Sequence, residues 1–264
     1  MATTKIRSSS ILDGQVANAD LSATVAVTGG QIADGAITIA KLAATGAASA
    51  GTYLQGDNTW GAIAASGFNS VIVYTGSATW TKSARPAGIT KVIVEVQGGG
   101  GGGARQYTSA YVCAGSGGGY AKKFIDVSSV TASVISVGLG GAGAVGPADA
   151  SGVSGGDSSW IDTASGGSST VTGVKGVGGI HTPAWSTAIG GAATGGDINI
   201  AGQNGDPEAW GKSGDSQLGR GGQNVFLGQL LTGASTGYGA GGAGGFRMSA
   251  LDGRDGVVIV WEYK

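Results

Sequence analysis

Short segments rich in β-branched and aromatic residues recur from residue 68 to the end of the chain, and glycine-rich runs separate them. These segments predict β-strands at residues 71–74, 78–81, 91–97, 120–127, 132–137, 158–162, 168–172 and 256–263. Helical periodicity is almost absent, so the fold class that we predict is all-β. The last strand is apolar enough to lie centrally in a sheet with the early strands. The glycine-rich middle would then be a large insertion into a β-sandwich-like domain.

Glycine accounts for 56 of the 264 residues, and it is concentrated in runs such as 98–103 and 239–245. Ordering so much glycine costs backbone entropy, so these runs are ordered only where backbones pack closely or loops need unusual angles. Packed polyglycine II helices, with three residues per turn, suit this composition, and irregular glycine loops are the alternative. Collagen is excluded because the chain has only 4 prolines and its glycines do not recur at every third residue.

The N-terminal region contains two copies of the pattern I-x-D-G-x-[V/I]-x-x-A-x-L, offset by 21 residues. The Asp-Gly pairs at 13–14 and 34–35 predict turns. The residues after each turn form a thin apolar stripe that one copy cannot bury alone, so we expect neighbours from other chains. The predicted attachment and trimerisation residues are Ile11, Val16, Leu21, Ile32, Ile37 and Leu42.

These patterns divide the chain into three parts. Residues 1–45 form an extended, trimeric N-terminal region of attachment and trimerisation repeats. Residues 46–66 form a connector of small and polar residues with a predicted tight turn at 56–58. For this connector, a plain linker and a small trimeric plug around Trp60 are both open interpretations. Residues 67–264 form the glycine-rich β domain.

Charge and hydropathy exclude several classes of protein. The 15 Lys and Arg residues balance the 16 Asp and Glu residues, and no basic stretch stands out, so we predict no nucleic-acid partner. No apolar run approaches the roughly 20 residues of a membrane span, and the N-terminus lacks the apolar core of a signal peptide. Cys113 is the only cysteine, so no internal disulfide can form, and we interpret it as a buried thiol. We therefore expect a protein made in a cytoplasm.

Motifs for catalysis are weak throughout the chain. Two G-x-S-x-G matches, at Ser154 and Ser235, lack the following helix that a nucleophile elbow needs. His181 is the only histidine, which excludes a two-histidine metal site, and we predict neither a metal nor a cofactor. A glycosidase pair would have to come from carboxylates that we expect mostly in turns, namely Asp157, Asp162, Asp197, Asp206, Glu208 and Asp215. We predict that the protein is not an enzyme.

Aromatic residues in the glycine-rich part are better candidates for function. Each lies among small residues, which leaves two interpretations. The side chain packs at a domain edge or in a contact between subunits, or it is exposed at the tip of a loop and binds a partner. Loops held on a rigid scaffold are the usual place for recognition. The candidate contact residues are Tyr107, Tyr111, Trp160, His181, Trp185, Trp210 and Phe226.

The chain resembles bacteriophage tail fibre proteins. Its N-terminal repeats look like repeats of fibre shafts, and residues 51–60 look like the T-[F/Y]-L-x-G-D-x-T-W element that often precedes a fibre tip. The remainder is similar to a glycine-rich C-terminal domain of phage fibres. The similar stretches lie at 74–80, 91–100, 117–121, 137–143 and 253–262. The ordered set covers nearly the whole chain.

This resemblance implies a homotrimeric, virion-attached receptor-binding fibre that is assembled in the host cytoplasm. The N-terminus would dock onto a phage tail or baseplate protein, and the C-terminal part would bind a bacterial surface glycan or an outer-membrane protein. The resemblance also implies stacked polyglycine II helices with variable loops. A tail-associated glycan hydrolase and a purely structural virion fibre are the alternative functions.

Overall fold

The computed structural model describes residues 52–55, 59–62, 66–107, 111–181, 186–209, 216–218, 220–223, 225 and 237–264. The chain divides into two compact units, Met1–Ala65 and Ser66–Lys264. In the first unit, strands β1 (Thr52–Leu54) and β2 (Trp60–Ala62) form an antiparallel pair. The turn predicted at 56–58 lies outside the described residues. So do the six predicted trimerisation residues Ile11, Val16, Leu21, Ile32, Ile37 and Leu42.

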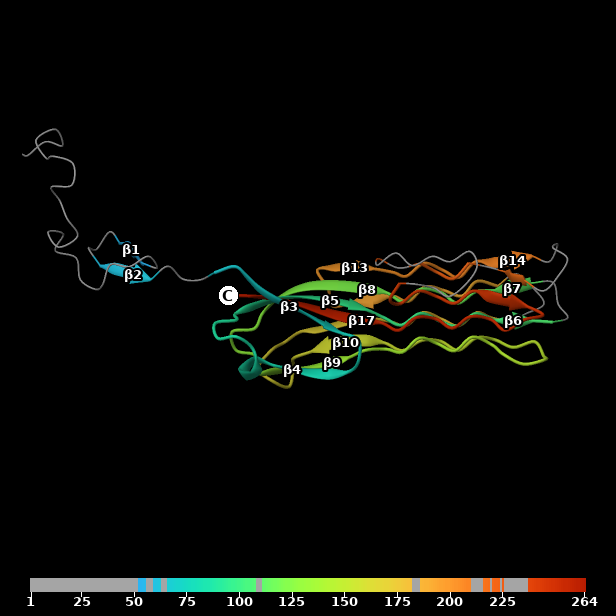
Figure 1. Ribbon diagram of the computed structural model, residues 1–264, viewed down its shortest axis with the longest axis horizontal. Coiled ribbons are helices and arrows are strands. Elements are labelled where there is room, and N and C mark those ends of the chain that lie inside the picture. The colour runs from blue at the N-terminus through green and yellow to red at the C-terminus, as the bar shows by residue number, and fades with distance from the viewer. Residues whose placement is uncertain are drawn as a thin grey trace, which may run out of the picture. The chain divides into compact units, whose positions relative to one another are not determined.

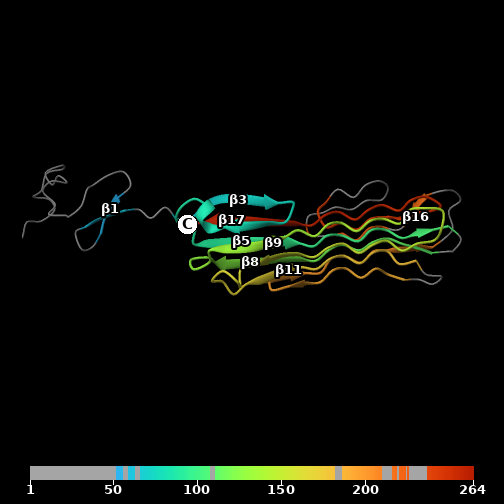
Figure 2. The ribbon, with the colours of Figure 1, turned by 90° about the horizontal axis from the view of Figure 1, so that it is seen from below.

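Two five-stranded antiparallel sheets form one end of the second unit (Figures 1 and 2). The first sheet has the order β13-β8-β5-β17-β3, made of Ile198–Ile200, Tyr120–Asp126, Lys91–Gln97, Val257–Tyr263 and Phe68–Tyr74. The second has the order β12-β11-β10-β9-β4, made of Ala193–Thr194, Thr170–Gly173, Ser158–Ile161, Ala132–Ser136 and Ala78–Thr81. The described residues contain no α-helix, only a 3-10 turn at Lys82–Ala84. The all-β prediction is therefore confirmed.

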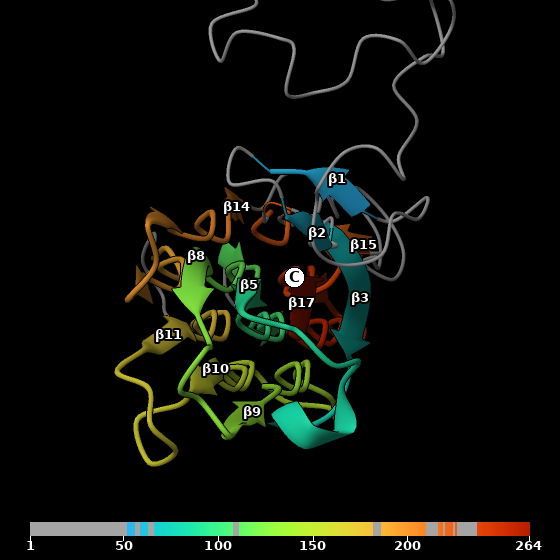
Figure 3. The same cartoon turned by 90° about the vertical axis from the view of Figure 1, so that its left-hand side faces the viewer.

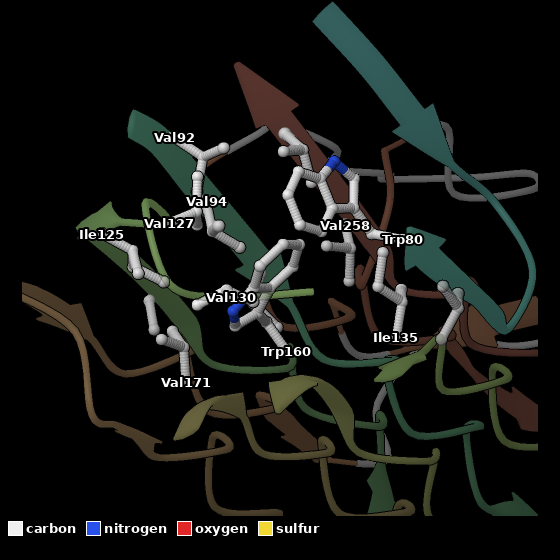
Figure 4. Packing of buried hydrophobic residues seen from close by; sticks show 14 of the residues in the cluster. Trp80, Val92, Val94, Ile125, Val127, Val130, Ile135, Trp160, Val171 and Val258 are labelled. Carbon is white, nitrogen blue, oxygen red and sulfur yellow. The ribbon is translucent and has the colours of Figure 1, made fainter. Parts of the chain in front are cut away.

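The sheets face each other through alternating apolar side chains. In β5, Val92, Val94 and Val96 are fully buried. The final strand β17 lies between β5 and β3, as its apolar sequence predicts, and places Val258 and Val260 in the same core. Two tryptophans fill the space between the sheets, as Figure 4 shows. Trp80 of β4 and Trp160 of β10 have ring centroids 5.5 Å apart, and both are fully buried.

Glycine-rich segments run side by side away from this sandwich (Figures 1 and 2), and the described residues contain ten of them. Most continue a strand directly: residues 98–104 follow β5, and residues 250–256 lead into β17. Figure 3 looks along them, so that they are seen end-on. The segments span residues 98–104, 114–119, 138–144, 150–157, 174–180, 187–192, 201–206, 220–223, 239–245 and 250–256.

Hydrogen bonds between these segments follow a three-residue period. In segment 98–104, the N–H groups of residues 98, 101 and 104 donate to carbonyls of residues 119, 116 and 113. Residues 99 and 102 donate to segment 150–157, and residues 100 and 103 donate to segment 250–256. Its carbonyls accept from three other segments, 138–144, 174–180 and 239–245. The segment thus has six hydrogen-bonded neighbours, and segment 114–119 is surrounded in the same way by segments 98–104, 174–180, 187–192, 201–206, 220–223 and 239–245.

Close approach of the backbones requires glycine at the inner positions. A Cβ atom at Gly100 would lie 2.0 Å from the carbonyl oxygen of Ala240. This clash could be relieved only by moving a neighbouring backbone. Side chains appear where a segment faces solvent. In segment 138–144 and just beyond it, Leu139, Ala142 and Val145 are exposed at every third position.

Candidate functional site

Five connections between glycine-rich segments meet at the end of the bundle opposite the sandwich (Figure 1). Their described residues are 105–107 and 111–113, 145–149, 181 and 186, 207–209 and 216–218, and 246–249. Short strands join their described parts: β6 (Arg105–Gln106) pairs with β16 (Gly244–Phe246), which also pairs with β15 (Ser216–Leu218), and β7 (Tyr111–Cys113) pairs with β14 (Pro207–Ala209). We call the described residues of these five connections the tip. Backbone hydrogen bonds between strands therefore join the connections that contain β6 and β7, β14 and β15, and β16.

Arg105 fixes three of these connections to one another. Its side chain follows directly on segment 98–104, and the residue is only 5% exposed. The Nε group donates to the carbonyl of Met248 at 3.0 Å, and a terminal guanidinium nitrogen donates to the carbonyl of Ala148 at 3.1 Å. A buried guanidinium that donates to two backbone carbonyls favours the one tip conformation in which both carbonyls lie within reach.

Tyr107 is the exposed aromatic residue of the tip, with 46% of its surface accessible. Its ring centroid lies 5.6 Å from Cζ of Arg105 and 5.9 Å from Cζ of Arg247. Its backbone N–H donates to a carboxylate oxygen of Asp149. The other carboxylate oxygen of Asp149 lies 3.4 Å from Nε2 of His181. Asp149 therefore connects two of the predicted contact residues, Tyr107 and His181.

Arg247 has an unusual backbone conformation for its residue type. Its φ angle is +52°, and among the described residues it is the only residue other than glycine with a positive φ. Its N–H donates to the carbonyl of Gln106 at 2.8 Å, and its Cζ lies 5.3 Å from the ring centroid of Phe246. The left-handed conformation is unfavourable for an arginine, so the surrounding contacts must hold it.

The other predicted contact residues have different outcomes. Tyr111 lies in β7, is half-buried, and donates its N–H to the side chain of Gln106 at 2.9 Å. The prediction of Trp160 as an exposed contact residue is wrong, because Trp160 is fully buried between the two sheets and donates to Asp162. Trp185, Trp210 and Phe226 lie outside the described residues.

Sequence reasoning missed three residues that shape the tip: Arg105, Asp149 and Arg247. A signal for two of them is present in the sequence. Arg105 comes two residues after the glycine run 98–103, and Arg247 comes two residues after the run 239–245. A charged residue just beyond an extended glycine run marks the point where the chain turns back, but this signal needs the bundle to be known first.

Several carboxylates and hydroxyls considered for catalysis instead accept backbone hydrogen bonds. Asp157 accepts from Lys175 N–H at 2.9 Å, and Ser154 accepts from Gly178 N–H at 3.2 Å. Asp162 accepts from Ser169 N–H at 2.6 Å, and Asp197 accepts from Phe124 N–H at 2.9 Å. Asp157 is therefore a bundle residue rather than the turn residue that we expected. The described residues contain no group of three or more His, Cys, Asp or Glu side chains that could hold a metal ion.

Comparison with protein-family models and with curated protein sequences gives no match for this chain. Among the described residues, no helix is long and apolar enough to cross a membrane. The functional assignment therefore depends on the sequence resemblance and on the geometry of the tip.

Proposed function

We propose that the protein is a non-enzymatic phage tail fibre adhesin that attaches the virion to a glycan or an outer-membrane protein on the bacterial surface. The observation that carries this proposal is the tip: several connections present Tyr107, Arg247 and His181 together at the end of a densely hydrogen-bonded bundle. Recognition residues are commonly placed on loops that a rigid scaffold positions. The tail fibre resemblance supplies the biological setting.

The glycine-rich bundle is, in this proposal, an insertion of polyglycine II helices into the sandwich domain. Two features support it. The hydrogen bonds recur every third residue, as expected for a helix with three residues per turn. Segments 98–104 and 114–119 each bond to six neighbouring segments. Backbones can come close enough for this only where most residues are glycine. Such a bundle extends the tip away from the sandwich without an apolar core of its own.

We further propose that the fibre is a homotrimer in which the outer face of the β3-containing sheet contacts the same face of the other copies. Eight apolar residues register on this face, which also carries Lys91, Glu95, Lys122 and Asp126: Phe68, Val71, Val73, Ile93, Phe124, Ile259, Trp261 and Tyr263. Its charges face one another in pairs: Glu95 lies 3.1 Å from Lys122 and accepts from Trp261 and Tyr120, and Asp126 is registered opposite Lys91. β3 also begins directly after the connector 46–66, which follows the region that we predict to trimerise. Three joined N-termini would hold three such faces at high effective concentration.

Residues 1–45 would attach this trimer to a tail or baseplate protein, which places the protein in the virion. The predicted repeats support this role because an apolar stripe on a short repeat needs a partner chain. Assembly would take place in the host cytoplasm.

A cell-binding assay tests the proposed function. Fluorescently labelled protein is added to a panel of bacterial strains, and bound fluorescence is measured by flow cytometry, with heat-unfolded protein as the control. We expect saturable binding to a subset of strains and no release of sugar from their purified surface polysaccharides. Sugar release would instead support the glycan hydrolase. Assembly on virions without binding to any strain that the virions infect would support the purely structural fibre.

A further inference from the structure

Arg247 combines backbone strain with an exposed, charged side chain at the tip. Its φ of +52° is a conformation in which glycine or asparagine is ordinarily found. The side chain belongs to an exposed residue, so packing in a core does not explain the choice of arginine. A strained residue that persists at a surface site is a reason to look for a binding role.

The contacts of Arg247 place its guanidinium group over two aromatic rings. Its Cζ lies 5.3 Å from the ring centroid of Phe246 and 5.9 Å from that of Tyr107. Contacts with aromatic rings use none of the N–H donors of a guanidinium as conventional hydrogen bonds to oxygen, so these donors remain for an acceptor. Within the described part of the chain, no side chain or backbone oxygen accepts a hydrogen bond from the Arg247 guanidinium, and no carboxylate lies within ion-pair distance.

Asp149, the tip carboxylate beside Tyr107, is already engaged elsewhere. Asp149 accepts from the Tyr107 N–H and faces His181 Nε2 at 3.4 Å. Arg105, the second guanidinium beside the Tyr107 ring, donates to the carbonyls of Met248 and Ala148. The exposed ring of Tyr107 thus lies next to two positive charges, and Arg247 is the exposed one of the pair.

We propose that Arg247 and Tyr107 form a subsite for an anionic group, a carboxylate or a phosphate, on a surface saccharide. The guanidinium of Arg247 binds two oxygens of the anion with parallel N–H groups, and the sugar ring packs against Tyr107. Aromatic rings provide a large contact area at small entropic cost, which suits a saccharide face. This inference rests on the proposed function, because it names the class of receptor that the adhesin binds.

The test uses the full-length protein and three polyacrylamide probes that carry glucuronic acid, glucose 6-phosphate or glucose. Biolayer interferometry measures binding of wild type and of the variants Arg247→Gly, Arg247→Lys and Lys175→Ala. Lys175→Ala removes one positive charge from an exposed position on the side of the bundle and serves as the matched control. Arg247→Gly relieves the positive φ, so its melting temperature should equal or exceed that of the wild type.

We expect wild type to bind at least one anionic probe and not to bind the glucose probe. The probe that binds identifies a uronic acid or a phosphate as the anion. Arg247→Gly should weaken binding at least tenfold, Arg247→Lys should weaken it less, and Lys175→Ala should leave it unchanged. No binding of wild type to either anionic probe, equal binding of the glucose probe, or an equal loss in Lys175→Ala would overturn the proposal.

The same variants distinguish this inference from the adhesin function. If wild type and Arg247→Gly bind bacterial cells equally, the anionic subsite is wrong and the adhesin function stands. If wild type binds no cells at all, the adhesin function fails, whatever the probes show.

Discussion

At the scale of single residues, the position of a side chain in the bundle decides whether it is tolerated. Inner positions of the glycine-rich segments face a neighbouring carbonyl at a distance that leaves no room for a methyl group. Ser116 is informative because its hydroxyl donates to the Ile189 carbonyl at 2.7 Å and accepts from Val177 N–H at 2.7 Å. A small side chain is thus accepted inside the bundle where it also satisfies polar backbone groups.

Gly102→Ala should destabilise the domain by about 3 kcal/mol, because the new methyl group would lie 2.1 Å from the carbonyl oxygen of Ala142. Urea unfolding followed by tryptophan fluorescence measures the change. Gly76→Ala is the matched control, since nothing lies within 4 Å of its added methyl group, and its stability should change by less than about 0.5 kcal/mol. Equal stability of Gly102→Ala and wild type would show that the bundle is not packed as described.

At the scale of elements, each outer segment must satisfy the N–H groups that reach no backbone carbonyl of a neighbouring segment. Side chains at three-residue spacing do this: Asp252 and Asp255 accept from Gly143 and Gly140 at 2.7 Å each. Ser151, Ser154 and Asp157 accept in the same way from residues 181, 178 and 175. The polar residues of the glycine-rich region are therefore part of its hydrogen bonding.

Asp252→Ala should lower the free energy of unfolding by about 1 kcal/mol, because the N–H of Gly143 loses its acceptor. Asp252→Asn keeps a side-chain oxygen at the same place and should stay close to wild type. Thermal unfolding by calorimetry compares the two variants. Equal destabilisation by both would show that the negative charge, and not the hydrogen bond, matters at this position.

The sequence predicts the sandwich better than the bundle, and there is a physical reason for this. Strands such as 91–97 have their own two-residue pattern of apolar side chains, so their position and the central place of the last strand can be predicted. The bundle is held by backbone groups, which every sequence shares. Its side-chain signal is a three-residue spacing, as in Leu139, Ala142 and Val145, which strand and helix patterns do not include.

Trp160 shows why the prediction of the contact residues was partly wrong. The residue lies in a segment that is predicted as a strand, yet its glycine-rich surroundings suggested an exposed tip. Strand alternation takes precedence, because Trp160 points between the sheets and fills the core with Trp80 (Figure 4). At the tip, the pairing of Tyr107 with His181 through Asp149 joins residues from three connections. Such an arrangement depends on the tertiary structure and has no local sequence pattern.

At the scale of the whole molecule, the proposed trimer makes a prediction about mass. One chain has a mass of 25.3 kDa, so three chains give 3 × 25.3 = 75.9 kDa. Light scattering of the purified protein should show this mass. The double variant Val71→Glu and Val73→Glu places charges on the apolar outer face and should shift the mass toward that of a single chain. A monomeric wild type would contradict the trimer, and an unchanged mass of the variant would exclude this face from the interface.

The central claim is that the tip binds the bacterial surface, and one measurement tests it most directly. Tyr107→Ala and Leu139→Ala are compared with wild type in binding to a strain that wild type binds, and circular dichroism checks that both variants are folded. Leu139 is 70% exposed on the side of the bundle, so it controls for the loss of any exposed apolar side chain. The account predicts at least tenfold weaker binding by Tyr107→Ala and unchanged binding by Leu139→Ala. Wild-type binding by Tyr107→Ala, or an equal loss in both variants, would contradict it.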